Sequence, residues 1–191
     1  MKSNQDVKIL AITGMTGSGK SAATEYLKSK GVPSIYFGGI IYKEMNEAGI
    51  EITPESQQKF REEIREREGK DFVVRRAIKQ VHDLVNAGQK RIILDGLYSW
   101  TEYKVFKHEF PGEVILVAMV PPKRIRYERI GKRSDRPFSQ EEANQRDWSE
   151  IENLEKGGPI ALADYYIVND STEEETHGKI DEIVREIGFL G

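Results

Sequence analysis

The chain of 191 residues is long enough for one domain with a substantial apolar core, and we expect residues 1–191 to form a single domain. Its formal net charge is -3, which excludes the strongly basic field that draws proteins to nucleic acid polymers or anionic membranes. It has no cysteine, so disulfides, thiol nucleophiles and thiolate metal sites are excluded.

A small molecule is therefore the expected partner. The amino-terminal segment Met1–Lys8 is polar, and no apolar run approaches the roughly 18 residues that a membrane span requires. We expect a cytoplasmic protein, a monomer or a homodimer, that does not contact a membrane.

Apolar runs of strand length alternate with segments of helical period, beginning near the amino terminus. Val7–Thr13 is rich in β-branched residues and is followed by a glycine, which predicts the first strand. Ser21–Lys30 follows as a predicted helix, and Pro33–Phe37 as a short second strand that ends at Gly38–Gly39.

A long stretch without a strand pattern comes next, from about residue 40 to residue 87. It is mostly helical and rich in charge, with a helix start at Thr53-Pro54 and a break at Gly69. Two further apolar runs, Arg91–Asp95 and Glu113–Val120, are long enough only for buried strands.

The remaining segments continue the alternation. The predicted helices occupy Ser99–His108, the segment opened by Pro121 and Pro122, Ser139 to about Lys156, and Thr172–Ile187, with a last strand at Asp164–Asn169. Ser139 with Glu142 and Thr172 with Glu175 have the spacing of a capping box. The pattern predicts an α/β fold: a five-stranded parallel sheet with helices on both faces, in three layers, and ligands at the carboxyl ends of the strands.

Residues 14–21 read Gly-Met-Thr-Gly-Ser-Gly-Lys-Ser and fit the phosphate-loop pattern G-x-x-x-x-G-K-S, with a predicted strand before them and a helix after them. Glycines let the amide hydrogens point at phosphate oxygens, and the helix directs its positive end to the same charge. Lys20 would neutralise the β- and γ-phosphates, and Ser21 would offer a hydroxyl to Mg²⁺. The expected ATP-binding residues here are Gly14, Thr16, Gly17, Ser18, Gly19, Lys20, Ser21 and Ala22.

Asp95 ends a strand-like apolar run, at the tip where the strand would face the phosphate loop. It could hold the metal ion there directly or through water. We therefore predict Ser21 and Asp95 as metal-binding residues, and Lys20 and Asp95 as members of the catalytic set.

Cationic side chains are unusually frequent between residues 122 and 138. Arg126, Arg129 and Arg133 have the spacing of one helical face, where like charges repel unless an anion lies among them. Guanidinium groups suit the spread charge of a transferring phosphoryl group, so Arg129 and Arg133 are predicted to bind the donor and to act in catalysis. We predict a lid at about residues 130–140.

Several segments together resemble the adenylate kinase and dephospho-coenzyme A kinase branch of P-loop kinases, and in particular a family of small proteins described as adenylate-kinase related. The matching residues are the phosphate loop, Asp95-Gly96 with Ser99 and Phe106, Arg126–Arg129, Arg133–Asp135, Arg146-Asp147 and Ile160–Asn169. The resemblance implies a P-loop core, a helical acceptor-binding region at about residues 38–87 and an arginine-bearing lid. It also implies that Asn169 and Asp170 contact the donor base.

The chain departs from these families on the acceptor side. Adenylate kinases and their relatives tend to carry an aspartate and an arginine after the second strand, where this chain has Gly39 and Tyr42, and a further arginine where it has Tyr98. Dephospho-coenzyme A kinases place aspartates near the second strand end, and Phe37–Gly39 provides none. We assign Gly39, Tyr42, Arg76 and Tyr98 to the acceptor site. Other cations of this region could bind an anion from different directions: Lys43, Lys59, Arg61, Arg65 and Arg75.

These features predict an ATP-dependent phosphotransferase that moves the γ-phosphoryl group to a small molecule, with a nucleoside monophosphate as the first choice. The alternative is an acceptor hydroxyl, as in dephospho-coenzyme A kinases or nucleoside kinases, for which Asp95 is the candidate base. An ATP-dependent switch, or a degenerate kinase that only binds nucleotide, is the interpretation from a different class.

Overall fold

The computed structural model describes residues 6–134 and 137–190; residues 135 and 136 of the predicted lid, and residues 1–5 and 191, lie outside this description. At its centre five parallel strands pair in the order β2-β3-β1-β4-β5. Their bounds are β1 Lys8–Thr13, β2 Ser34–Tyr36, β3 Arg91–Asp95, β4 Val114–Met119 and β5 Tyr165–Ile167. The predicted five-stranded parallel sheet is confirmed.

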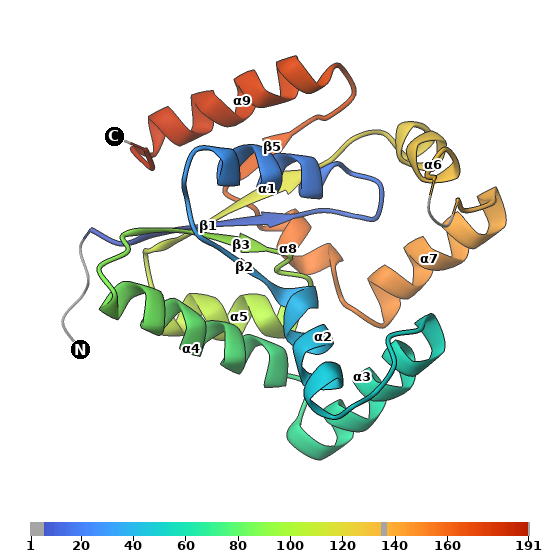
Figure 1. The fold of residues 1–191 in the computed structure, drawn as a ribbon. Helices are drawn as coiled ribbons and strands as arrows, with labels where there is room; N and C mark the ends of the chain where they lie inside the picture. The colour runs from blue at the N-terminus through green and yellow to red at the C-terminus, as the bar shows by residue number, and fades with distance from the viewer. Residues whose placement is uncertain (1–5, 135–136, 191) are drawn as a thin grey trace.

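Helices cover both faces of this sheet (Figure 1). On one face lie α1 (Lys20–Ser29) and α9 (Glu173–Glu186), and on the other lie α4 (Phe72–Asn86) and α5 (Trp100–Glu109). The arrangement is the predicted three-layer α/β/α fold, in which the carboxyl ends of the parallel strands form one edge.

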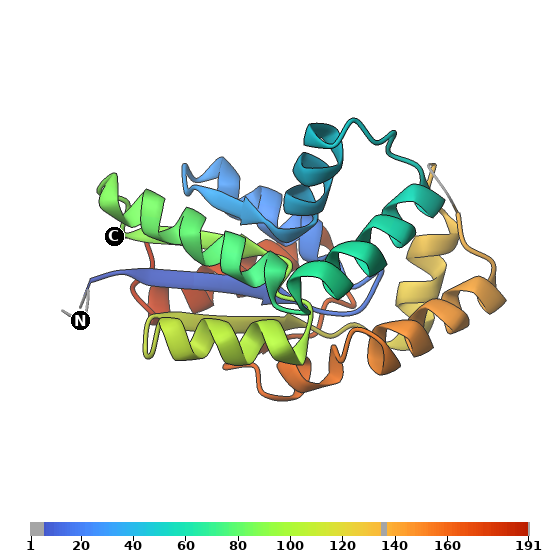
Figure 2. The same ribbon diagram turned by 90° about the horizontal axis from the view of Figure 1, so that it is seen from below.

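Two helical arms extend beyond the carboxyl ends of the strands (Figure 2). The α2–α3 arm consists of α2 (Phe37–Glu47) and α3 (Pro54–Glu68). The α6–α7 arm consists of α6 (Lys123–Gly131) and α7 (Gln140–Glu152), and the short helix α8 (Gly157–Ala161) leads from it back to β5. The phosphate loop, which follows β1, therefore lies at the edge of the sheet from which both arms project.

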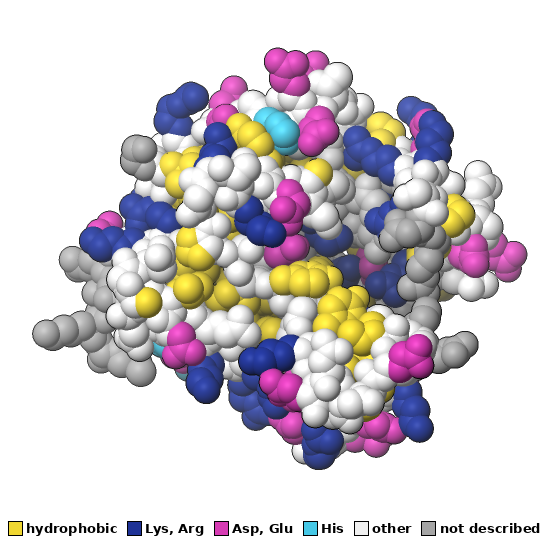
Figure 3. Space-filling view, viewed as in Figure 1, with side chains coloured by type: hydrophobic (Ala, Val, Ile, Leu, Met, Phe, Trp, Pro, Cys, Tyr) yellow, Lys and Arg dark blue, Asp and Glu magenta, His cyan; other side chains and the backbone are white. Residues whose placement is uncertain are grey.

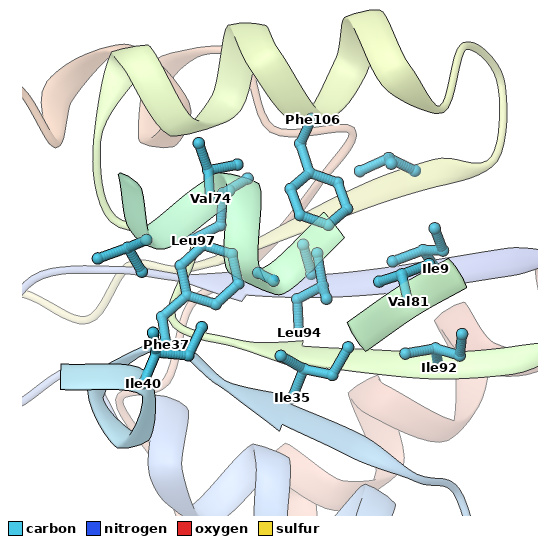
Figure 4. Close-up of a cluster of buried hydrophobic side chains, with 14 of the residues drawn as sticks. Ile9, Ile35, Phe37, Ile40, Val74, Val81, Ile92, Leu94, Leu97 and Phe106 are labelled. Atoms are coloured by element: carbon cyan, nitrogen blue, oxygen red, sulfur yellow. The ribbon is translucent and has the colours of Figure 1, made fainter. Parts of the chain in front are cut away.

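Two apolar clusters hold the layers together, one on each face of the sheet. In the larger one Phe106 of α5 and Val74 of α4 pack over Ile9 and Leu94 of the central strands (Figure 4). All four side chains are completely buried, and burial of such a side chain stabilises the fold by roughly 1.5–3 kcal/mol. This rigid base sets the positions from which the functional loops extend.

Helix starts follow the capping signals of the sequence. Thr53 caps α3 with Pro54 as its first residue, and the Ser139 and Thr172 hydroxyls accept hydrogen bonds from Glu142 N and Glu175 N. The caps fix where each arm leaves the core.

Two predicted boundaries are wrong, both beside the site. The second strand ends at Tyr36, and Gly38–Gly39 lie in the first turn of α2 and not in a turn after a strand. Glycines are present here because the Tyr36 ring packs against them. A Cβ on Gly38 would lie 2.4 Å from the Tyr36 hydroxyl. The helix predicted to reach Lys156 ends at Glu152, because the chain turns at Glu155, which has a left-handed φ of 54°.

Candidate functional site

The phosphate loop runs from β1 into α1 with the conformation that its glycines allow. Gly14, Gly17 and Gly19 have φ values of 147°, 81° and 92°. A Cβ on Gly19 would lie 2.2 Å from Asn169 Nδ2, so this position admits no side chain. Gly19 caps α1 without a side-chain hydrogen bond, which leaves the first amides of the helix directed at the space in front of them.

A cavity of about 320 Å³ opens in front of this loop. The face of the molecule shown in Figure 3 is hollowed between the core and the α6–α7 arm, with Lys and Arg side chains in the hollow. The cavity is lined by Gly17, Gly19, Lys20, Ser21, Ala22, Ala23, Arg129, Arg133, Asn169, Ser171, Glu173, Thr176 and His177. Most predicted donor-binding residues thus share one cavity, although Gly14, Thr16, Ser18 and Asp170 are not among its lining residues.

The cavity has the electrostatics of an anion site. Burial lowers the pKa of Lys20 to about 8, and the nearby charges of Lys156 and Arg133 also lower it, against Glu150 and Asp95. Arg129 Nη1 and Ser171 Oγ are buried without a hydrogen-bond partner in the described part of the chain. A polyphosphate would supply both the missing negative charge and the missing acceptors, so these residues fit the nucleotide that the loop predicts.

Arg133 differs from its predicted placement. The helix ends at Gly131, so Arg133 does not share a helical face with Arg126 and Arg129. Arg129 and Arg133 nevertheless both line the cavity, whereas Arg126 is buried and pairs with Asp147 through bonds of 2.7 and 2.6 Å. The repulsion argument therefore does not apply to Arg126, because a carboxylate of α7 already neutralises it.

Asn169 lies against the phosphate loop and not free in the cavity. Its Nδ2 donates to Ser18 O at 2.9 Å, and its Oδ1 accepts from Thr176 Oγ1 at 2.8 Å. Asp170 is exposed. The end of the cavity away from the loop is formed instead by residues that the sequence analysis did not single out: Ser171, Glu173, Thr176 and His177. Their position in the chain could have indicated them, because they follow the last strand and lie at the start of the next helix, where ligands bind in parallel α/β sheets.

Thr16 has partners other than a ligand. Its amide and its hydroxyl both donate to the Glu150 carboxylate, at 2.9 and 2.6 Å, and Arg126 donates to its carbonyl oxygen at 3.0 Å. These bonds join the phosphate loop to the α6–α7 arm, and the role of Thr16 in binding ATP stays a prediction. Nothing in the sequence near Thr16 indicated that arm as its partner.

Asp95 and Ser21 supply the oxygen atoms available for a cation. Asp95 is half-buried at the end of β3; burial raises the pKa of its carboxyl, and nearby Lys20 opposes that shift. Ser21 is exposed at the cavity wall. The described residues contain no group of three or more His, Asp or Glu side chains that could hold a metal alone. Such a pair suits Mg²⁺, which takes most of its ligands from substrate phosphates and water.

Tyrosine side chains gather near Asp95, at the end of the sheet where α2 begins. Tyr36 pairs with Asp95 in the sheet register, and its ring lies 6.4 Å from that of Tyr42, centroid to centroid. Tyr98 lies over Gly96, and burial raises its pKa, with Asp95 and Tyr36 the next contributors. The structure thus brings Tyr42 and Tyr98 of the predicted acceptor site to the Asp95 end of the sheet, and Gly39 underlies the Tyr36 ring.

Arg76, the fourth residue of the predicted acceptor site, already has ion-pair partners within the protein. It forms ion pairs with Glu44 and with Glu68, the latter at 2.9 Å, and its guanidinium lies 5.5 Å from the Phe72 ring centroid. These contacts join α4 to both helices of the α2–α3 arm. Arg76 thus has carboxylate partners of its own, and its assignment to the acceptor site stays a prediction.

Arg61 and Arg65 of α3 are two further cations of the predicted acceptor region, and Arg61 lies within electrostatic reach of Tyr42 and Tyr36. Burial lowers the pKa of Arg61, and the guanidinium groups of Arg146 and Arg65 lower it further, while Tyr42 raises it. In the described parts of the chain, no carboxylate lies within salt-bridge distance of Arg61 or Arg65. Arg61 therefore lies within electrostatic reach of Arg65 and of Arg146 of α7, and of these three cations Arg146 already pairs with Glu150.

The strand order, the loop between β1 and α1, and the two arms define a P-loop kinase-like fold. A family model described as an AAA domain matches residues 10–153. The chain belongs to this AAA domain family and, by its sequence relatives, to the UPF0200 family.

Two relatives illustrate the match. A UPF0200 protein of Thermococcus onnurineus is 37% identical over 182 residues, which cover 94% of this chain and 97% of the relative. One of Sulfurisphaera tokodaii is 37% identical over 188 residues, which cover 95% of this chain and 98% of the relative.

Solved structures show the same fold at low sequence identity. Shikimate kinase from Bacteroides thetaiotaomicron superposes with a TM-score of 0.61 at 12% identity, over 93% of this chain and 98% of the other. Dephospho-CoA kinase from Campylobacter jejuni gives a TM-score of 0.54 at 19% identity, over 94% and 97%. Among the described residues, no helix has both the length and the apolar character that crossing a membrane requires.

Proposed function

We propose that this protein is an ATP- and Mg²⁺-dependent phosphotransferase whose acceptor is a small molecule with an anionic group, a nucleoside monophosphate being the first choice. One observation supports it above the others. Lys20 is half-buried, lines the donor cavity with Arg129 and Arg133, and lies within electrostatic reach of Asp95, at the end of the sheet where Tyr36 and Tyr98 lie. A donor and an anionic acceptor would then meet at Lys20.

The side chains suggest how the reaction would proceed. Mg²⁺, when bound, would draw charge from the β- and γ-phosphates, with Ser21 and Asp95 nearest to hold it. Lys20, Arg129 and Arg133 would stabilise charge on the transferring group, since cations placed in advance act most strongly away from bulk water. With a phosphate as acceptor, no strong general base is needed.

The predicted acceptor region supports an anion more than a neutral alcohol. Arg61 has two further guanidinium groups near it, those of Arg146 and Arg65, and the rings of Tyr36 and Tyr42 lie near it as well. Planar guanidinium groups bind phosphate or carboxylate by paired hydrogen bonds, and tyrosines stack on a flat ring. A nucleoside monophosphate combines both features.

An ADP-release screen tests the proposal. Purified protein with Mg·ATP would be supplied in turn with nucleoside monophosphates, nucleosides, dephospho-coenzyme A and shikimate. We expect a nucleoside monophosphate to accelerate ADP release well above hydrolysis by water. If every acceptor leaves ADP release at the rate without acceptor, the phosphotransferase proposal is wrong and a nucleotide-binding role replaces it.

Binding of Mg·ATP is expected to weaken above pH 8. The Lys20 ammonium must be charged to bind phosphate, and its pKa in the free protein is about 8, below the ordinary 10.5. Above pH 8 the free protein loses this proton and must regain it on binding, so the affinity should fall by about tenfold per pH unit. Isothermal titration calorimetry from pH 6.5 to 9.5 measures this slope; a constant affinity would contradict a Lys20 contact with phosphate.

Arg61→Ala is expected to raise the KM for the anionic acceptor roughly tenfold or more, because a hydrogen bond to a charged group contributes about 1.5–3 kcal/mol. The KM for ATP should change little. Lys59→Ala, an exposed cation on the same helix, is the matched control. Steady-state kinetics with the acceptor found in the screen makes the comparison. Equal effects of the two substitutions on the acceptor KM would remove Arg61 from the site.

A further inference from the structure

Glu150 is a completely buried carboxylate in the last turn of α7. It accepts hydrogen bonds from Thr16 N at 2.9 Å and Thr16 Oγ1 at 2.6 Å, and from Arg146 Nε at 3.1 Å. Its partners lower its pKa to about 2 despite its burial, with Lys156 the strongest of them. Glu150 is therefore ionised, and it connects the phosphate loop to the α6–α7 arm.

Lys156 completes this group from the turn after α7. Its side chain is 3% exposed, and its ammonium lies 2.7 Å from Glu150 Oε1 and 5.0 Å from the centroid of the Tyr98 ring. The left-handed turn at Glu155 brings it there, together with a bond from Lys156 N to Glu150 O of 3.1 Å. The turn that ends α7 thus places a second lysine next to the proposed site.

A purely structural link would not need two buried charges. Desolvation of an ion pair costs about as much as the attraction returns, and neutral side chains of similar volume often stabilise a fold equally well. The position of this pair supplies a reason for the charges. Lys156 is the charged group that lowers the pKa of Lys20 most, and Glu150 is the carboxylate that opposes this shift most strongly. The pair therefore lies within electrostatic reach of the phosphate-binding lysine.

We propose that Glu150 and Lys156 form a positioning pair for phosphoryl transfer: Glu150 fixes Thr16 of the phosphate loop and holds Lys156, next to the Tyr98 ring, as a second positive charge within reach of Lys20. The inference rests on the proposed function. Its first test measures nucleotide binding alone, so the result does not depend on the outcome of the acceptor screen.

The first test compares Glu150→Gln with wild type and with Glu152→Gln, an exposed glutamate on the same helix. Lys156 is faced by Glu150 and Arg146 of α7, Glu102 of α5, Lys20 of α1 and Tyr98 after β3. Removal of the Glu150 charge leaves both lysines with less negative charge around them, so each gives up its proton at lower pH.

The measured quantity is the Kd for Mg·AMP-PNP at pH 6.5 and pH 8.0. Wild type and Glu152→Gln should lose about twofold in affinity between these values, as a Lys20 pKa of about 8 requires, whereas Glu150→Gln should lose about tenfold. A pH ratio in Glu150→Gln equal to that of wild type, whatever the change in absolute affinity, overturns the proposal.

A second variant covers the case in which Glu150→Gln does not fold, since removal of one buried partner is strongly destabilising. The double variant Glu150→Gln/Lys156→Met removes both charges and should keep a thermal midpoint near that of wild type. It should nevertheless bind Mg·AMP-PNP about tenfold more weakly at pH 6.5, because the hold on Thr16 and the second cation are lost. Wild-type affinity in a stable double variant would show that the pair is only structural.

Discussion

Lys20→Ala is expected to lower acceptor-dependent ADP release by about 10³-fold, the scale at which loss of one preorganised charge acts on a transition state. Lys20 lines the donor cavity as part of the phosphate loop, where its ammonium would contact the β- and γ-phosphates. Steady-state ADP release with the acceptor from the screen measures the loss. Lys28→Ala, an exposed lysine of α1, is the control that should remain active.

The same substitution should not lower the stability of the protein without nucleotide. Burial holds the folded pKa of Lys20 at about 8, below its ordinary 10.5, so the charged form costs stability below pH 8, and this cost disappears as the pH rises toward 10.5. Alanine removes the buried charge. We expect a thermal midpoint at pH 7 equal to that of wild type or higher, together with lost activity. A clear fall in the midpoint would mean that Lys20 is mainly a structural residue.

The parts of the fold and site that the sequence predicted are those set by local chemistry. The residues of the phosphate loop determine its shape through their own φ preferences, and the hydroxyls of Ser139 and Thr172 determine where their helices begin. Strands β1, β3 and β4 were recognised because each is a short, buried, apolar run between polar segments, whereas β2 and β5 at the sheet edges are shorter and only partly buried. Such signals lie within a few residues, so they can be read without the fold.

The errors concern partners that are far apart along the chain. Gly38 looked like a turn residue, because no local signal says that the Tyr36 ring will lie on it. The ion pairs of Arg76 could not be predicted either, because its two glutamate partners come from α2 and from the end of α3. Glu150 and Lys156 resembled the many other charges of this chain, and only the fold shows that they are buried beside Thr16.

The second large effect is expected at the pair between Arg126 and Asp147. Their side chains are 9% and 13% exposed and meet through two hydrogen bonds, and Arg126 also donates to Thr16 O at 3.0 Å. Arg126→Ala leaves the Asp147 carboxylate buried without this cation, which should cost about 3–5 kcal/mol of unfolding free energy. Urea denaturation measures this cost. Arg124→Ala, an exposed arginine of the same helix, should leave stability unchanged within error.

Loss of stability alone would not show that this pair serves the site, so a second variant separates the two roles. Arg126→Met/Asp147→Leu removes both charges and should recover most of the stability, because apolar side chains of similar volume can replace a buried pair. The bond to Thr16 O stays broken, and α6 then holds Arg129 less firmly against the phosphate loop. We expect this variant to fold and still bind Mg·AMP-PNP at least fivefold more weakly than wild type. Equal affinity would mean that Arg126 holds the arm to the core without setting the geometry of the donor cavity.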